Sequence, residues 1–336
     1  MGKETGGTER CDNVHPLVRI IAGRLILGLF SLLAVSVIIF AALEMLPGDF
    51  ARSILGQSAT PEAVAAIRHD LGLDRPAVIR YVEWLSGVLQ GDFGTSLSGR
   101  GVEGRRSVAG LVLPRLGNTF LLALLAVAIA FPIAFLLGLT AAMNRGRRID
   151  RLINSVALAF VAMPEFLIGY LLIYWLAVRA GLLPPLASVG PDTPPGERLM
   201  RMILPAVTLS LTVAAHILRM TRASLSELFE RPWMEALQLK GIPMAIAVRR
   251  HALPNAAGTI ANIFAFNIAW LITGVVVTER VFVYPGIGQL MVDAVASRDV
   301  PVVQACALIF ATVYIGLNLL ADIIAVASNP RLLHPR

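Results

Sequence analysis

The chain contains, between two long apolar runs, the stretch Glu235-Ala236-Leu237-Gln238-Leu239-Lys240-Gly241 and, a little further on, His251-Ala252-Leu253-Pro254. Arg231-Pro232 ends the element before this stretch, because a residue followed by proline is pushed out of the helical region. Residues 233–240 are expected to form about two helical turns. Glu235 lies early and Lys240 lies last, where the helix dipole favours an acid and a base respectively. Gly241 is a natural stop, so the stretch predicts a compact, rigid helical knob outside the apolar runs.

The composition is that of a membrane protein. The chain has 336 residues, of which 56% are hydrophobic and 15% are charged, and its mean hydropathy is +0.72. A soluble domain carries about 25% charged residues, so lipid is the expected solvent. The formal net charge of +7 is explained by basic flanks of membrane segments, and no nucleic-acid partner is expected. Cys11 and Cys306 offer neither a disulfide framework nor a metal pair.

Six runs are free or nearly free of charge, and each is close to the length of about 20 residues that spans a bilayer. They cover residues 25–43, 116–144, 152–178, 202–218, 252–278 and 300–327. Pro164-Glu165 interrupts the third run, so a kinked or broken helix is expected there. Arg19 and Arg24 precede the first run and no Ala-x-Ala site follows it, which indicates an uncleaved span rather than a signal peptide. The sequence therefore predicts an all-α membrane protein with six transmembrane helices.

The spans divide the chain into segments. These are an N-terminal cytoplasmic tail at 1–18 (with 1–17 expected to be disordered), the first transmembrane helix at 19–46, an extracytoplasmic segment at 47–115, a core of five transmembrane helices at 116–328 with a cytoplasmic loop at 220–254, and a C-terminal cytoplasmic tail at 329–336. Within 47–115, one helix is expected to start at Thr60-Pro61-Glu62 and to stop at Gly72. A second helix is expected to start at Asp74-Arg75-Pro76. The second helix carries Tyr81 and Trp84 on an apolar face. Both helices would lie on the membrane surface or pack on the extracytoplasmic mouth of the membrane domain.

Basic residues in the short loops predict the orientation, because cytoplasmic loops carry an excess of lysine and arginine. The loop after the second span holds Arg145, Arg147, Arg148 and Arg151, and the loop after the fourth holds Arg222, Arg231, Lys240, Arg249 and Arg250. Both loops are therefore expected in the cytoplasm. The prediction is a multi-pass protein of the inner cell membrane with both termini inside.

Motifs for covalent chemistry are missing from the sequence. A P-loop needs Gly-Lys followed by Ser or Thr, and the lysines of the chain are Lys3 and Lys240, neither in that context. None of the five histidines begins a His-Glu-x-x-His zinc motif, and no Gly-x-Ser-x-Gly elbow occurs. We therefore expect no catalytic residue, metal site or bound cofactor in this chain, and any ATP hydrolysis would belong to a partner.

Ionisable groups within spans are candidates for function. Glu165 lies near the substrate path if the proline break lines a cavity, or is a carboxylate at a helix end or paired with an arginine. Asp322 lies one turn after Asn318, and a structural pair with an arginine is favoured over a contact with substrate. His216 is expected to be a satisfied histidine near Arg219.

The Glu-Ala stretch with its glycine and later Leu-Pro resembles the EAA loop of the membrane subunits of binding-protein-dependent ABC importers. Leu237 and His251 depart from the commonest pattern, in which Ala and Ile stand there. Other matching motifs follow the order of the dipeptide, oligopeptide and nickel permeases between residues 19 and 331: Leu46-Pro47-Gly48-Asp49, Leu71-Gly72-Leu73-Asp74-Arg75-Pro76, Gly91-Asp92-Phe93-Gly94-Thr95-Ser96, Glu279-Arg280-Val281-Phe282, Tyr284-Pro285-Gly286-Ile287-Gly288, Asn318-Leu319-Leu320-Ala321-Asp322 and Asn329-Pro330-Arg331. Taken alone, Tyr284-Pro285-Gly286 could be a plain turn.

The resemblance implies a type I ABC importer permease fold and a non-catalytic subunit that forms half of a translocation pathway for peptides by alternating access. It implies a second related permease, two ATP-binding subunits that use ATP and Mg, an extracytoplasmic solute-binding protein and surrounding lipid. The residues expected to couple to the ATPase are Trp233, Glu235, Ala236, Leu237, Lys240 and Gly241, with Glu165 as a possible path residue. Nickel, opine or glutathione remain alternative substrates. An ATP-independent channel or carrier, and a membrane enzyme, remain alternatives from other classes.

Overall fold

The computed structural model describes residues 16–45, 60–70, 74–97, 106–190 and 192–327. The predictions for the tails 1–15 and 329–336, for Leu46-Pro47-Gly48-Asp49 and for Gly72 as a helix stop lie outside these residues.

The described chain is built from helices. In chain order they are α1 (Pro16–Glu44), α3 (Pro61–Asp70), α4 (Ala77–Leu89), α5 (Val108–Met143), α6 (Arg148–Ala162), α7 (Glu165–Leu172), the π-helical turn η2 (Ile173–Arg179), α8 (Pro195–Phe229), α9 (Pro232–Leu239), α10 (Met244–Ala247), the π-helical turn η3 (Val248–Ala252), α11 (Leu253–Val281), α12 (Ile287–Ala296) and α13 (Val300–Ala327). The all-α prediction is confirmed.

Five helical segments are long and apolar enough to cross a membrane, and the bent pair of α6 with α7 and η2 makes up to six if it counts as one span. This agrees with the six predicted runs. Some helices are longer than their apolar parts. α8 has 35 residues where the apolar run covers 202–218, and α5 begins at Val108 rather than at residue 116.

The predicted interruption at Pro164 is a true break. Met163 has an extended backbone (φ −86°, ψ 133°), as expected for a residue before proline. α6 and the α7–η2 segment are bent by 104° there. The chain thus turns sharply within what hydropathy alone would read as one span.

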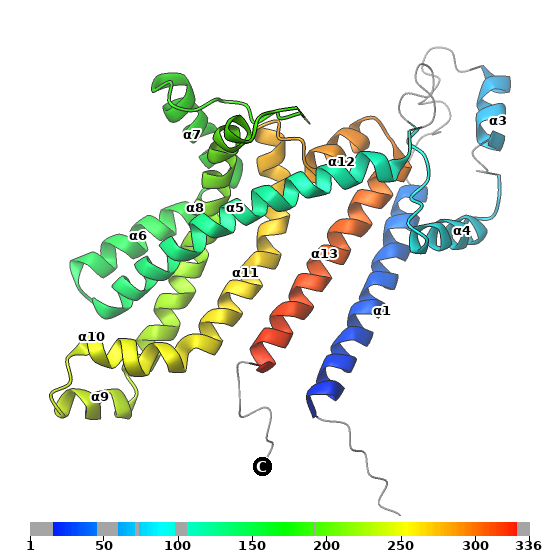
Figure 1. The fold of residues 1–336 in the computed structure, drawn as a ribbon. Coiled ribbons are helices and arrows are strands. Elements are labelled where there is room, and N and C mark those ends of the chain that lie inside the picture. Colours follow the sequence, from blue (N-terminus) through cyan, green and yellow to red (C-terminus); the bar gives the residue numbers. More distant parts are fainter. Residues whose placement is uncertain (1–15, 46–59, 71–73, 98–105, 191, 328–336) are drawn as a thin grey trace, which may run out of the picture.

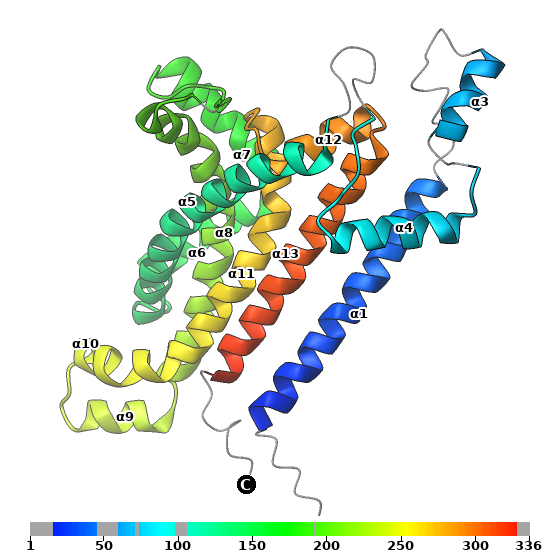
Figure 2. The same ribbon diagram turned by 45° about the vertical axis from the view of Figure 1, so that its right-hand side comes forward.

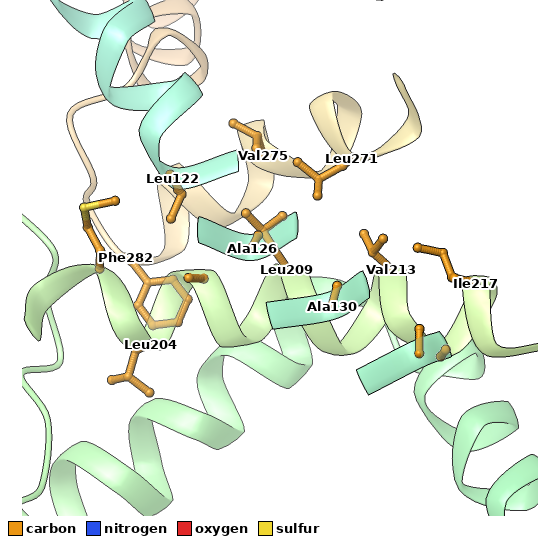
Figure 3. Close-up of a cluster of buried hydrophobic side chains, with 14 of the residues drawn as sticks. Leu122, Ala126, Ala130, Leu204, Leu209, Val213, Ile217, Leu271, Val275 and Phe282 are labelled. Atoms are coloured by element: carbon orange, nitrogen blue, oxygen red, sulfur yellow. The ribbon is translucent and has the colours of Figure 1, made fainter. Parts of the chain in front are cut away.

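The core lies where α5, α8 and α11 meet (Figure 3). α5 presents small residues at every fourth position to its neighbours: Ala126, Ala130, Ala134, Gly138 and Ala142, all buried. Small side chains let membrane helices approach closely. A Cβ added at Gly138 would lie 2.9 Å from the Leu218 backbone oxygen, and the Ser210 hydroxyl donates to the Ala126 carbonyl across 3.0 Å. α5 and α8 are therefore in close backbone contact.

The two ends of the molecule carry different elements. α3, α4 and α12 lie at one end, and α9 and α10 lie at the other, the end at which α1 begins (Figures 1 and 2). α1 packs mainly along α13. The predicted helix starts at Pro61 and after Pro76 are confirmed. On α4, the ring of Tyr81 stands 5.4 Å from that of Phe40 in α1.

Candidate functional site

The predicted helical knob is present as α9, which projects with α10 from the end of α8 (Figure 1). It spans Pro232–Leu239, with Arg231 as N-cap and Lys240 as C-cap. Pro232 occupies the first helical position, where its missing N–H is not needed. Glu235 lies in the first turn, as the dipole favours.

The end of α9 is fixed by a pair of backbone hydrogen bonds. The Gly241 N–H donates to the Gln238 carbonyl at 2.9 Å, and the Ile242 N–H donates to the Leu237 carbonyl at 3.1 Å. This is the Schellman pattern, which needs a left-handed residue after the C-cap. Gly241 supplies it with φ 74°. The glycine therefore sets the angle between α9 and the chain that follows.

One face of α9 is attached to its own chain. Met234 is fully buried in a small cluster with Ala247 of α10 and Ala252 of η3. The partly buried Phe229, Leu237, Ile242 and Met244 pack around this cluster. Leu237, the position where the family usually has Ala, thus faces inward in this chain. Hydrophobic contacts hold α9 against the end of α8, α10 and η3.

The other face of α9 is turned away from this cluster and includes the exposed residues Trp233, Glu235, Ala236, Leu239 and Lys240. Leu239 is 83% exposed and Trp233 is 36% exposed. Large apolar side chains between an acid and a base are typical of a surface that contacts another protein, where aromatic anchors carry much of the binding energy.

Glu165 lies at the break between α6 and α7 and is the first residue of α7. Its carboxylate accepts a hydrogen bond from the Thr278 hydroxyl of α11. A Cβ added at Gly274 would lie 2.6 Å from the Glu165 Oε2 atom. The carboxylate thus lies at a helix end and against α11, and its partner is a hydroxyl rather than an arginine. Its place near the substrate path stays a prediction.

Asp322 and His216 have structural neighbours. The Arg24 Nη1 atom of α1 lies 2.6 Å from the Asp322 Oδ2 atom of α13, so the predicted pair with an arginine is confirmed. The His216 ring meets the edge of the Trp270 ring at a centroid distance of 5.0 Å.

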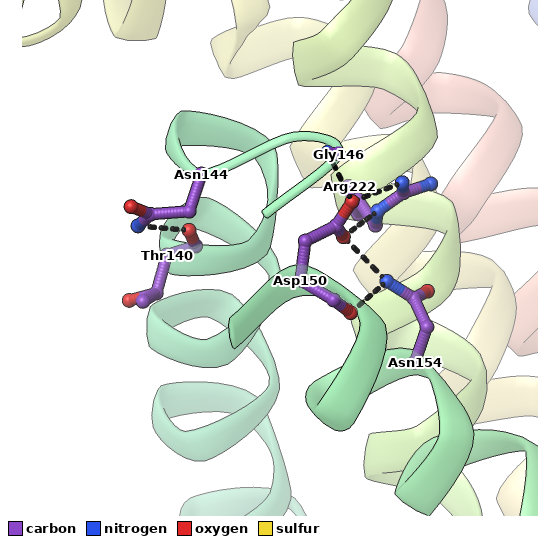
Figure 4. A network of polar contacts seen from close by, with 6 residues as sticks. All are labelled: Thr140, Asn144, Gly146, Asp150, Asn154 and Arg222. Atoms are coloured by element: carbon purple, nitrogen blue, oxygen red, sulfur yellow. Dashed lines mark hydrogen bonds and ion pairs between the residues drawn. The ribbon is translucent and has the colours of Figure 1, made fainter. Parts of the chain in front are cut away.

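A buried ion pair that sequence reasoning missed joins α6 to α8 (Figure 4). Arg222 donates from Nε to Asp150 Oδ1 at 2.6 Å and from Nη2 to Oδ2 at 2.8 Å. The Gly146 N–H and the Asn154 amide complete the shell around the carboxylate at 2.9 Å and 2.7 Å. The sequence signal for this ion pair was Asp150, a single acid among the arginines of the loop after the second span. The pairing could not be predicted from this signal, because the partner Arg222 lies 72 residues away in the chain.

A second missed residue is Glu279, which is fully buried at the end of α11. Its carboxylate accepts hydrogen bonds from the Thr119 hydroxyl at 2.6 Å, the Gly288 N–H at 2.8 Å and the Gln289 N–H at 3.1 Å. It therefore satisfies the free N–H groups at the start of α12. A Cβ at Gly286 would lie 1.8 Å from the Glu279 Oε1 atom. The Tyr284-Pro285-Gly286 turn is consequently built around this carboxylate.

Groups of three or more His, Cys, Asp or Glu side chains that could hold a metal ion do not occur among the described residues.

Comparison with known proteins defines the class. Residues 134–334 match the model of the binding-protein-dependent transport system inner membrane component, and residues 17–123 match the N-terminal model of the same membrane components. The chain belongs to this family. It is an ABC importer permease of the dipeptide and oligopeptide type and a multi-pass protein of the inner membrane, as the resemblance implied.

Particular relatives span almost the whole chain. It is 35% identical over 309 residues to a probable peptide ABC transporter permease protein, y4tP, of Sinorhizobium fredii, covering 92% of this chain and 97% of the relative. It is 36% identical over 306 residues to the glutathione transport system permease protein GsiC of Escherichia coli strain K12, covering 91% and 96%. Among solved structures, an inward-facing MetNI methionine ABC transporter is similar in fold, with a TM-score of 0.51, 18% identity, and coverage of 65% of this chain and 96% of the other.

Proposed function

We propose that this chain forms half of the translocation pathway of an ATP-driven importer for peptides, and that α9 is the helix through which an ATP-hydrolysing partner moves it. The observation that carries the proposal is the two-sided character of α9. Met234 anchors one face in its own chain, while Trp233, Leu239 and Lys240 are exposed on the other face.

The proposed mechanism is alternating access. Closure of two ATP-binding subunits on ATP and Mg pulls on α9, and the movement passes into α8 and α11, which flank the hairpin in the chain. Three residues of α9 and its C-terminal turn have separate tasks in this mechanism. Glu235 accepts charge-assisted hydrogen bonds from the partner, Ala236 keeps the contact close, and Gly241 fixes the angle of the helix. Glu165 lies along the path of the solute.

The full assembly contains a second related permease, two ATP-binding subunits and an extracytoplasmic solute-binding protein. The α9–α10 hairpin and the start of α1 lie at one end of the molecule (Figure 2), which supports a cytoplasmic location for both. Peptides are the favoured solutes. Glutathione, itself a small peptide, is the first alternative because relatives are named for its transport. Nickel and opines are the further alternatives within this architecture.

The test is cross-linking of Leu239→Cys to the ATP-binding subunit in membranes that contain the whole assembly, together with uptake. Val78→Cys is the matched control, because Val78 is also an exposed apolar residue but lies on α4 at the opposite end. We expect a cross-link from residue 239 only, and uptake that requires the co-expressed ATPase. Uptake without the ATPase would instead support an ATP-independent channel or carrier.

The solute itself is identified by purifying the assembly with its solute-binding protein and analysing the bound molecule by mass spectrometry. A peptide is the expected result, and a bound metal complex would contradict the peptide assignment without affecting the role of α9.

A further inference from the structure

The end of α8 and the start of α9 form one mechanical unit. Glu230 and Arg231 alone separate the two helices in the chain. Phe229, the last residue of α8, packs against the cluster that buries Met234 of α9. A displacement of α9 is therefore transmitted to the last turns of α8, the region that holds Arg222.

Arg222 in turn holds the beginning of α6. The Asp150 side chain is 4% exposed, and its carboxylate accepts both arms of the Arg222 guanidinium, the Gly146 N–H and the Asn154 amide (Figure 4). Bidentate charge-assisted pairs are strong and geometrically specific. Removing one partner of such a shielded pair leaves a charge without compensation. In addition to the apolar packing of α6 against the core, the α5–α6 turn is thus clamped to α8 by a well-shielded ion pair.

A second ion pair at the same turn differs in burial. Arg145 pairs with Glu230, but the two side chains are 51% and 64% exposed. Exposed pairs contribute little because water and salt screen them. This pair therefore serves as an internal control for the clamp.

α6 leads from the clamp toward the break at Pro164. It has 15 residues, which corresponds to about 22 Å of helix. Beyond the break, Glu165 contacts Thr278 and the backbone at Gly274 of α11. The far end of α6 is therefore joined, through Met163 and Pro164, to the residue whose carboxylate contacts the neighbouring spanning helix.

We propose that Asp150 and Arg222 are positioning residues for transport: by clamping α6 to α8 they make α6 a lever that carries the movement of α9 across the break at Pro164 to Glu165 and α11. This rests on the proposed function of α9. Neither residue contacts the solute or the ATPase in this account, and both act by keeping α6 and α8 together during the cycle.

The experiment uses double electron–electron resonance to measure distances between spin labels in the whole assembly, without nucleotide and after trapping with ATP and vanadate. One label pair reports on α9 through its hairpin partner α10 (Ile246→Cys with Tyr314→Cys), and the other reports on α6 (Leu158→Cys with Tyr314→Cys). These positions are exposed in this chain. Cys306 is buried and is retained, and Cys11 is replaced by serine.

The clamp variants are Asp150→Asn, which removes the negative charge, and Arg222→Lys, which keeps the positive charge but cannot form the bidentate pair of hydrogen bonds. Arg145→Gln is the matched control at the exposed pair. In the parent and in the control, we expect trapping to change both distances. In the clamp variants, the α9 change should persist, while the ratio of molecules with the trapped α6 distance to those with the untrapped α6 distance falls at least about fivefold, the lower end of coupling between two sites.

An α6 distance that changes as in the parent in Arg222→Lys, with the assembly and its ATP hydrolysis intact, would overturn the inference. Arg222→Lys decides the question if Asp150→Asn does not assemble. If the α9 distance does not respond to ATP even in the parent, the proposed function itself fails, and the two failures are thereby distinguished.

Discussion

Gly241 shows how a single residue can serve both the shape of a helix end and the surface beside it. Its backbone is left-handed, with φ 74°, yet no atom lies within 4 Å of the place where a Cβ would stand. A side chain fits there, so its cost is conformational rather than steric. Asn and Asp accept the left-handed region more readily than other residues.

Gly241→Asp is expected to abolish uptake and its coupling to ATP hydrolysis while membrane insertion stays intact, because it adds a negative charge at the end of the exposed face of α9. Gly241→Asn is the matched control, since it has nearly the same volume without the charge. Uptake, ATP hydrolysis and the amount of protein in the membrane are measured together. Normal transport by Gly241→Asp would refute a docking role for this surface.

Gly286→Ala is expected to destabilise the protein by about 2 kcal/mol, the usual range for overpacking a filled interior. The added Cβ would collide with the Glu279 carboxylate, which holds the start of α12. Gly196→Ala is the control, because nothing lies within 4 Å of its Cβ position. Thermal unfolding in detergent is the measurement, and equal midpoints for both variants would contradict this account of the turn.

The position of an acidic residue relative to the apolar runs explains whether it could be recognised as a candidate from the sequence. Glu165 and Asp322 stand out as acids within apolar runs, and the choice of an arginine for Asp322 is confirmed by Arg24. Asp150 and Glu279 lie at the edges of such runs, where acids are common. Their partners, Arg222 and Thr119, are 72 and 160 residues away, and only the folded chain brings them together.

Among the helices, α5 and α8 form the closest pair, and their contact depends on the row of small residues along α5. Gly138 is the most demanding position of that row, because its backbone approaches the Leu218 carbonyl. Packing of this kind relies on van der Waals contact rather than on a hydrophobic driving force between helices.

Gly138→Leu is expected to separate α5 from α8 and to lower stability by about 2 kcal/mol or more, again by overpacking. Gly117→Leu is the matched control within the same helix, since its Cβ position has no neighbour within 4 Å. Thermal unfolding of both variants in detergent provides the comparison. A Gly138→Leu protein as stable as the control would mean that α5 and α8 are held together by other contacts.

The positions of the helices were largely predictable, and so were helix ends marked by proline or glycine, but ends within charged segments were not. Hydropathy located the six runs, and proline placed the break between α6 and α7. The length of α8 was hidden because Glu197, Arg201 and Arg222 continue the helix beyond its apolar part. The short helix α12 was also missed, because its N-terminus is stabilised by Glu279 from another element.

At the scale of the whole molecule, α1 is joined to the rest mainly along α13, where Arg24 pairs with Asp322. The two side chains are 54% and 38% exposed. Partial exposure limits what such a pair contributes, so the apolar contact between the helices is expected to carry most of the attachment.

Arg24→Gln is therefore expected to cost less than about 1 kcal/mol. The pair Arg24→Asp with Asp322→Arg should recover part of the loss caused by either single reversal. Unfolding midpoints of the two single variants and the double variant form a double-mutant cycle. A double variant no better than the sum of the single ones would show that the two charges do not interact.

The attachment of α1 along one seam has a consequence for the surrounding bilayer. Most of its apolar side chains, including Leu25, Ile26 and Phe30, are exposed in this chain. The apolar part of α1 must lie within the hydrocarbon layer, and a difference between its length and the thickness of that layer costs free energy. In the proposed alternating-access cycle, vesicles made from shorter or longer acyl chains are expected to shift the balance between inward- and outward-open forms, and membrane thickness would then regulate the import rate.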